Sequence, residues 1–241
     1  MSLVSGVKHE EKLMKKIGLI GGISPTSTKL YYERIISSYY QAKKTNPEII
    51  IYSVDLQKYL YLLNTNKNQE LAQKFLNIIN SLKKAGADFV AITAVSMHVV
   101  MKFIKKKSTL PIIDGIYCLV KAMVRDKKKT ILLLGTDYVM KSKQFKDLFE
   151  SQKIEVIIPS SIERSVIESI IKTELNRGIV KIKSKKKLLS IIKKYTNKID
   201  CICLACTALP SILSQSDFTN KLKVYDFIES HIKVIVKESL K

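Results

Sequence analysis

The chain has 241 residues, of which 46% are hydrophobic and 26% charged, and its formal net charge is +21. This composition excludes an intrinsically disordered chain and predicts one large or two smaller globular domains with a substantial core. No apolar run reaches the roughly 20 residues of a membrane-spanning helix, and residues 1–16 lack the apolar segment of a signal peptide, so we expect a cytoplasmic protein with no membrane partner.

Short β-rich runs alternate with helical patterns along the chain, which is typical of an α/β protein with a parallel sheet. Strands are expected at residues 17–22, 48–54, 88–94, 130–136, 155–159, 200–206 and 223–227. Helices are expected at residues 26–44, 67–85, 138–151, 160–176 and 226–240. Gly86 and Gly178 lie where two of these helices should end. Continuous apolar runs of this kind indicate strands that are buried on both faces.

The two halves of the chain repeat one pattern. KKIGLIGGISPTSTKLYYERI at 15–35 matches KKTILLLGTDYVMKSKQFKDLF at 128–149, and GADFVAITAVSMH at 86–98 matches KIDCICLACTALP at 198–210. The economical interpretation is two similar Rossmann-like domains, each with a mainly parallel sheet flanked by helices. Because ligands of open α/β sheets bind beyond the carboxyl ends of the strands, the four turns should face one interdomain cleft.

Lysine accounts for nearly all of the basic excess, since the chain has only four arginines (Arg34, Arg125, Arg164 and Arg177). Arginine is the residue of bidentate phosphate and base recognition, whereas lysine more often serves as a solvated surface charge. The runs Lys105–Lys107, Lys127–Lys129 and Lys185–Lys187 lie between predicted elements and contain no aromatic residues. A solvated surface that attracts anionic metabolites is therefore favoured over a nucleic-acid partner.

Four cysteines without a secretory signal are expected to be reduced thiols. The CxCxxC spacing of Cys201, Cys203 and Cys206 suggests zinc, but no second Cys or His pair stands nearby at ligand spacing, so we expect no metal. Cys201 and Cys203 share one face of a predicted strand and are interpreted as small core residues.

The turn GGISPTST combines Gly22 with the hydroxyls of Ser24 and Thr28 at the start of a helix. Backbone amides and hydroxyls at a helix N-terminus can bind a carboxylate or phosphate, and an ordinary N-cap cluster is the alternative. Thr136 occupies the same position in the second half. The spacing fits neither a dinucleotide-binding nor a P-loop motif, so no cofactor is expected.

In the turn ACTALP, Cys206 ends a strand and Thr207 comes directly after it. A thiol near the positive end of the next helix should have a lowered pKa and could act as an acid or base. The alternative is a buried packing cysteine.

These motifs resemble the aspartate/glutamate racemase family of cofactor-independent amino-acid racemases. IGLIGGISPTSTKLYY is similar to the family's opening GGMSPEST-type motif, LACTALP to its GCTELP-type motif, and YDFIESH at 225–231 to its closing segment. The resemblance implies two α/β domains, a small carboxylate or amino-acid substrate, no cofactor and a homodimer. We divide the chain into a tail at 1–14, a first domain at 15–115 plus 226–241, and a second domain at 116–225.

In that family two cysteines act on opposite faces of the substrate, because inversion requires proton delivery opposite to proton removal. The resemblance assigns the second-domain cysteine to Cys206. Counting back from His98 puts Ala94 at the first cysteine, so this catalytic position is lost. Val95 replaces the usual asparagine, and Ser96 keeps the hydroxyl position.

Other departures affect the expected substrate and the second base. Thr93 is the nearest proton-carrying side chain to Ala94, and both Thr93 and His98 are candidates for an auxiliary role. Ala208 stands where the family has glutamate, and residues 50–63 contain no arginine to bind an acidic side chain, only Lys58.

Three functions therefore remain open. The first is a racemase that transfers the Cα proton of an amino acid or related carboxylic acid through Cys206. The second is a single-thiol enzyme of the arylmalonate decarboxylase kind, which protonates a carbanion after CO₂ loss. The third is a catalytically silent carboxylate-binding homologue.

Overall fold

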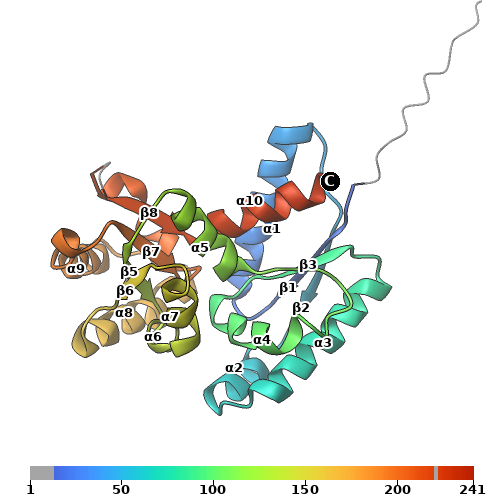
Figure 1. Cartoon of the computed structure of the whole chain (residues 1–241), viewed down its shortest axis with the longest axis horizontal. Helices are drawn as coiled ribbons and strands as arrows, with labels where there is room; N and C mark the ends of the chain where they lie inside the picture. The colour runs from blue at the N-terminus through green and yellow to red at the C-terminus, as the bar shows by residue number, and fades with distance from the viewer. Residues whose placement is uncertain (1–13, 220–221) are drawn as a thin grey trace, which may run out of the picture.

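The computed structural model describes residues 14–219 and 222–241, so nearly all of the predicted tail at 1–14 lies outside the described residues. Within these ranges the chain forms two four-stranded sheets, ordered β2-β1-β3-β4 and β6-β5-β7-β8 (Figure 1). Every strand pair is parallel. The predicted α/β class with two similar halves is therefore confirmed.

The second sheet repeats the arrangement of the first, since β1 and β5 each lie between the two strands that come next in sequence. The strands of the first sheet are β1 (Ile17–Gly21), β2 (Ile49–Ser53), β3 (Phe89–Ile92) and β4 (Ile112–Ile113). Those of the second are β5 (Thr130–Gly135), β6 (Glu155–Ile157), β7 (Cys201–Ala205) and β8 (Lys223–Asp226). Of these eight strands, the sequence predicted all except the two-residue β4.

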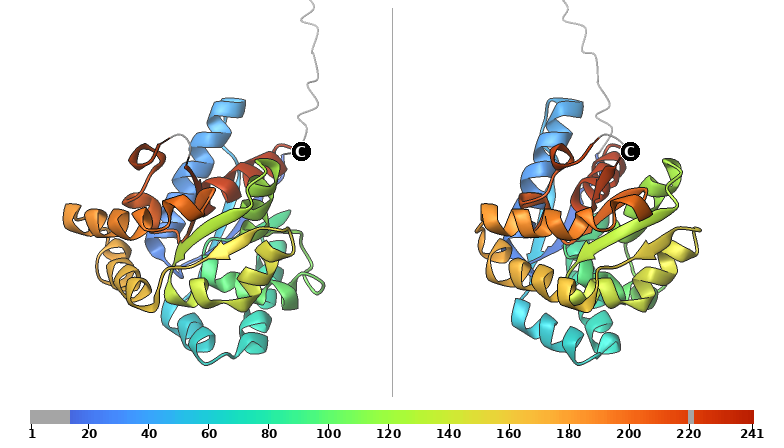
Figure 2. Two further views of the ribbon diagram at one scale, coloured as in Figure 1. Left: turned by 60° about the vertical axis from the view of Figure 1, so that its left-hand side comes forward. Right: turned by 90° about the vertical axis from the view of Figure 1, so that its left-hand side faces the viewer.

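The helices flank both sheets. They are α1 (Pro25–Lys43), α2 (Leu56–Asn64), α3 (Asn68–Lys84), α4 (Met101–Ile104), α5 (Gly115–Arg125), α6 (Asp137–Lys141), α7 (Lys143–Glu150), α8 (Ser161–Thr173), α9 (Ile182–Lys193) and α10 (Phe227–Ser239). Short 3₁₀ helices include η1 (Val95–Val100) and η4 (Leu209–Ser211). Figure 2 shows α2 and α3 (cyan) together at one end of the molecule. Among the helices of the described ranges, none combines the length and apolarity that crossing a bilayer requires.

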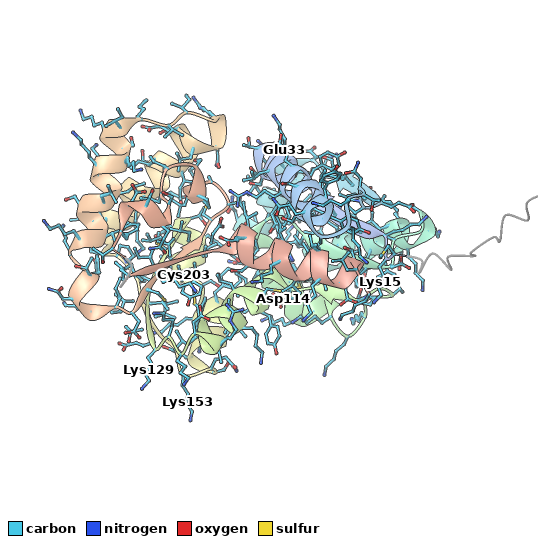
Figure 3. The ribbon with its side chains drawn as sticks, turned by 90° about the horizontal axis from the view of Figure 1, so that it is seen from above. Lys15, Glu33, Asp114, Lys129, Lys153 and Cys203 are labelled. Atoms are coloured by element: carbon cyan, nitrogen blue, oxygen red, sulfur yellow. The ribbon has the colours of Figure 1, made fainter. Side chains whose placement is uncertain are left out.

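Two expectations from the sequence need correction. The helix expected at 138–151 is divided into α6 and α7, because Ser142 between them has an extended backbone (φ −66°, ψ 111°). The run Lys185–Lys187 lies inside α9, not between elements. Lysine is a good helix former, and Leu188, Ile191 and Ile192 bury the opposite face of α9. The exposed side chains of Lys129 and Lys153 point outward from the second half (Figure 3).

Residues on opposite faces of the central strands enter different cores. Ile17 and Leu19 of β1 belong to a cluster that also contains Leu133 of β5 and residues of α1, α5, α7 and α10, so this core joins the two halves. Ile20 points into a separate core under α2 and α3. Cys203 lies fully buried in the shared core (Figure 3), together with Cys201, as the packing interpretation of these two thiols predicted.

Helices α5 and α10 lie side by side between the two halves (Figure 1). The predicted domain boundary at 115/116 falls in the first turn of α5, and the one at 225/226 falls at the end of β8. The division into domains stays a prediction; the first boundary lies where the chain passes from the first sheet to the second, and the other lies where it passes from β8 into the C-terminal helix α10.

Candidate active site

A cavity of about 400 Å³ lies at the carboxyl ends of the strands, where the two halves meet. All four turns after β1, β3, β5 and β7 contribute to its wall. Of the predicted site residues, those that line it are Ser24, Ala94, Ser96, Thr136, Cys206 and Thr207. The repeat in the sequence therefore predicted which turns come together.

Ser24 and Thr136 occupy equivalent positions, because each caps the N-terminus of the helix that comes after its strand. Ser24 Oγ accepts a hydrogen bond from the backbone N–H of Ser27 (3.3 Å), and Thr136 Oγ1 accepts one from Val139 (3.4 Å). The N-cap interpretation is correct for both residues. Since both also line the cavity, capping fixes two hydroxyls in its wall.

Gly22 and Thr28 shape the first turn but do not line the cavity. Gly22 has a φ of +89°, and a Cβ there would lie 2.4 Å from the backbone N and O of Val54, so the position requires glycine. Thr28 Oγ1 accepts from the Gly22 N–H (2.9 Å) and donates to the Ser24 carbonyl (3.1 Å). These two residues hold Ser24 in place.

Cys206 comes directly after β7, at the start of the second-half turn, and its side chain is largely buried, at 9% exposure. Burial raises the pKa of this thiol to about 11, and the Glu168 carboxylate adds to the rise, while the amides of Ala208 and Leu209 oppose it. The expectation of a lowered pKa was wrong. The next helical element is the short 3₁₀ helix η4, and its few amides do not outweigh the loss of solvent. At neutral pH the group is a thiol.

Thr207 links the two halves directly. Its Oγ1 lies 2.5 Å from Oγ of Ser27, in the first turn of α1. Ser27 is buried on the same face of α1 as Tyr31 and Ile35; the sequence placed it among the hydroxyls of GGISPTST but did not indicate this contact with Thr207. This hydrogen bond fixes the residue after Cys206 against the first half.

The turn after β3 places Ala94 in the cavity wall, with Val95 and Ser96 beside it. Thr93 is fully buried and does not line the cavity, and its Oγ1 donates to the carbonyl of Ile20 (3.2 Å). The Thr93 hydroxyl is thus bonded to the backbone of β1 and does not reach the cavity, so the structure does not support an auxiliary role for it. Among the described residues that line the cavity, Cys206 is the one thiol.

His98 is also buried and lies outside the cavity lining. Its Nε2 accepts from the backbone N–H of Gly115 (3.1 Å), so Nδ1 carries the proton and donates to the carbonyl of Ala94 (3.0 Å). Burial lowers the pKa of His98, which keeps the ring neutral. His98 thus fixes the Ala94 turn to the start of α5.

A second buried histidine supports the same junction. His231 Nε2 donates to the carbonyl of Ile113 (2.9 Å), and its Nδ1 accepts from the hydroxyl of Tyr31 (2.8 Å). Burial lowers the pKa of His231 to about 3, and the neighbouring His98 ring contributes. His231 thus attaches helices α1 and α10 to the end of β4, and its ring lies 6.0 Å from that of His98.

Charged and polar residues that the sequence did not indicate complete the wall. Glu168 and Lys172 of α8 form an ion pair (2.8 Å), and Glu168 Oε2 also accepts from the backbone N–H of Asp137 (2.8 Å). The other polar contributors are Asn64, Tyr138 and Asn176. Glu168 and Lys172 are spaced i, i+4, which is typical of an ion pair on a helix surface, but the sequence does not show that α8 borders the cavity.

Apolar side chains form the rest of the wall. They are Ile23, Leu56, Leu60, Leu63, Val95, Val139, Ile171 and Ala205. Within the described residues no group of three or more His, Cys, Asp or Glu is arranged to hold a metal ion. The cavity therefore offers a thiol, several hydroxyls and one ion pair to a small ligand.

Comparisons with known proteins agree with this geometry. Residues 20–235 match the model of a family described as Asp/Glu/hydantoin racemase. The broad-specificity amino-acid racemase RacX of Bacillus subtilis (strain 168) is 22% identical over 231 residues, which cover 91% of each protein. A structure from Yersinia pestis assigned to the Asp/Glu racemases has a TM-score of 0.87 and 30% identity, covering 95% of this chain and 100% of that one. An aspartate racemase homologue from Pyrococcus horikoshii has a TM-score of 0.82 and 28% identity over the same shares.

Proposed function

The chain belongs to the Asp/Glu/hydantoin racemase family, and on that premise we propose that it transfers the Cα proton of an amino acid or related carboxylic acid through the thiol of Cys206. The observation that carries the proposal is the position of Cys206, which borders the cavity together with hydroxyls from both halves. Proton transfer at an acidic carbon needs a group of this kind within reach of the bound substrate.

The surrounding groups have defined parts in this chemistry. The hydroxyls of Ser24, Thr136 and Thr207 line the cavity and can donate to the substrate carboxylate. Cys206 first loses its proton to solvent, a step that its raised pKa makes unfavourable at neutral pH. The thiolate then removes the Cα proton and becomes a thiol, and the electron pair left on Cα is delocalised into the carboxylate. Burial raises the pKa of Cys206, which makes its thiolate a stronger base for proton removal. The thiol then protonates the carbanion because the carbanion is a far stronger base than the thiolate.

The described residues that line the cavity include no second thiol to complete an inversion. Ala94 cannot carry a proton, and among the described residues the polar side chains on the first-half side of the cavity are the hydroxyls of Ser24 and Ser96 and the amide of Asn64. A hydroxyl is a far weaker acid than a thiol. We therefore propose that exchange at the Cys206 face, with retention of configuration, is faster than racemisation.

A second candidate is a single-thiol enzyme that protonates a carbanion after CO₂ loss. The same observation favours it, because delivery of one proton to one face needs only Cys206. Here the Cα–CO₂ bond breaks, its electron pair stays on carbon, and the thiol supplies the proton. Release of CO₂ from an α,α-disubstituted malonate would distinguish this activity.

The direct experiment is a screen of amino acids with the full chain in D₂O, read by proton NMR. Loss of the Cα–H signal for at least one amino acid is the expected result. Chiral chromatography of the same samples then reports racemisation. If the Cα–H signal persists for every amino acid at millimolar concentration, the proton-transfer proposal is wrong.

We further propose that the protein is a cytoplasmic homodimer. The observation that supports self-association is the exposure of four large side chains: Tyr32 and Tyr40 on α1, and Ile51 and Tyr52 on the edge strand β2. Exposed apolar side chains on an edge strand are a common feature of subunit contacts. Light scattering after size exclusion should report a mass near 55 kDa, about twice the 27.4 kDa of one chain.

A further inference from the structure

We infer that the side chain of the substrate is apolar, and that the inner face of α2 is the surface that selects it. The inference rests on the proposed function, since it concerns the substrate of that same cavity. It goes beyond the proposal because it excludes a carboxylate side chain, such as that of aspartate or glutamate, as the preferred group.

Helix α2 presents one apolar face to the cavity. Leu56, Leu60 and Leu63 are spaced i, i+4 and i+7, which puts them on the same side of the helix, and all three line the cavity. Tyr61, by contrast, is 58% exposed and does not line it. The helix is oriented by its N-cap Asp55, whose Oδ1 accepts from the backbone N–H of Gln57 (2.9 Å).

Apolar residues from three other turns and from α8 extend this surface. Ile23, Val95, Val139 and Ile171 are each buried and line the same cavity. The first three come from the turns after β1, β3 and β5, and Ile171 comes from α8. An apolar side chain enclosed by these walls gains free energy from burial, whereas a carboxylate would lose its hydration.

The charges near the cavity do not offset that cost for a carboxylate. Lys172 is the one cation among the described lining residues; its side chain is 68% exposed, and its ammonium group already lies 2.8 Å from the Glu168 carboxylate. A substrate carboxylate would have to displace Glu168 or lie beside its negative charge. The cation of α2 is Lys58, whose side chain is 75% exposed and pairs with Asp55 (3.7 Å).

Leucine and aspartate provide a matched pair for the test, because both branch at Cγ and differ in whether two methyl groups or two oxygens are attached. Binding of racemic leucine and racemic aspartate to the full chain is measured by calorimetry; racemic ligands keep their composition if the enzyme turns over. We expect leucine to bind at least about tenfold more tightly. Equal or tighter binding of aspartate overturns the inference, and so does undetectable binding of leucine at 10 mM, roughly the weakest affinity the method resolves.

Two variants that add the same charge to α2 test the surface itself. Leu60→Arg puts a cation in the cavity wall, and Tyr61→Arg puts it on the exposed side of the helix. We expect Leu60→Arg to reverse the preference toward aspartate and Tyr61→Arg to leave it unchanged. If Leu60→Arg is unfolded by circular dichroism, Leu56→Lys replaces it. An unchanged leucine preference in a folded Leu60→Arg contradicts the assignment to α2.

The inference and the proposed function fail in distinguishable ways. Calorimetry reports side-chain preference without turnover, and NMR reports Cα–H exchange. Tighter binding of leucine without exchange leaves the side-chain inference intact and contradicts proton transfer. Exchange of the aspartate Cα–H, together with tighter binding of aspartate than of leucine, supports proton transfer and contradicts the side-chain inference.

Discussion

The hydroxyl oxygens of Ser27 and Thr207 lie 2.5 Å apart, although 180 residues separate them in the sequence. Ser27 belongs to the first turn of α1 in the first half, and Thr207 is the residue after Cys206 in the second half. The bond therefore connects the two sides of the cavity at the point where the thiol is held. Ser27 is only 5% exposed, so water cannot easily take the place of its partner.

Removing this hydrogen bond should reduce the free energy of unfolding, and the effects of changing Ser27 and of changing Thr207 should not be additive. Ser27→Ala and Thr207→Val each leave a hydroxyl without its partner, while the double variant removes both. We expect a coupling energy of about 1 kcal/mol in a double-mutant cycle. The free energy of unfolding in urea gives the value, and Thr26→Ala, on the exposed side of the same helix turn, serves as the control. Strict additivity of the two single changes would show that the hydroxyls do not interact.

The raised pKa of Cys206 should be visible in its reactivity. Only the thiolate reacts with iodoacetamide, so the rate of alkylation at Cys206 should keep rising, by about tenfold per pH unit, until the pH approaches 11. In the urea-unfolded chain the rise should end near pH 9, the ordinary pKa of cysteine. Peptide mass spectrometry assigns the modified residue. A plateau of the folded protein at or below pH 9 is incompatible with the burial argument.

The buried histidines should make the fold sensitive to mild acid. The folded state holds His231 neutral, with a pKa of about 3, whereas the unfolded chain binds a proton near pH 6.5. Stability from this group is therefore complete above pH 6.5 and declines below it, by up to about 1.4 kcal/mol per pH unit.

His231→Gln tests that dependence, because glutamine can accept from Tyr31 and donate to Ile113 but does not titrate. Between pH 6.5 and 5, above the range in which carboxylates titrate in the unfolded chain, unfolding free energies of the variant should vary less with pH than those of the wild type. Parallel pH profiles for the two proteins would argue against a neutral His231 in the fold.

Sequence patterns predicted the strands and the turns of the fold more completely than they predicted its helices. The repeat predicted that Cys206 and Ala94 lie at one cavity, because parallel strands have their carboxyl ends at the same edge of a sheet. Helix α9 was missed because its lysine run was interpreted as a loop, although lysine favours helices. Helix α2 was missed as well, so the apolar wall was not foreseen.

Contacts between segments that are distant in the sequence could not be predicted from it, for a physical reason. The hydrogen bonds of His98 to Gly115 and of His231 to Tyr31 depend on how α1, α5 and α10 pack, and no local pattern encodes that packing. The pKa of Cys206 was predicted in the wrong direction for a related reason. A helix-terminus argument considers only the neighbouring amides, whereas burial by both halves determines the result.

Restoring a thiol at the first-half position should add inversion to exchange. Ala94→Cys places a proton-carrying group in the cavity wall, so racemisation should increase on the order of 10²-fold while exchange changes less. Thr93→Cys is the matched control, since residue 93 is buried and does not line the cavity. Chiral chromatography measures both variants. An equal gain for the two, or none for Ala94→Cys, would mean that the missing thiol does not limit inversion.

The most direct test of the account compares Cα–H exchange in D₂O by the wild type, Cys206→Ser and Cys118→Ser. Serine keeps the shape of the site but is a far weaker acid, and Cys118 is a buried thiol outside the cavity. We predict exchange by the wild type and Cys118→Ser, and a loss on the order of 10²-fold or more in Cys206→Ser. Exchange by Cys206→Ser at the wild-type rate would contradict the assignment of Cys206 as the group that moves the proton.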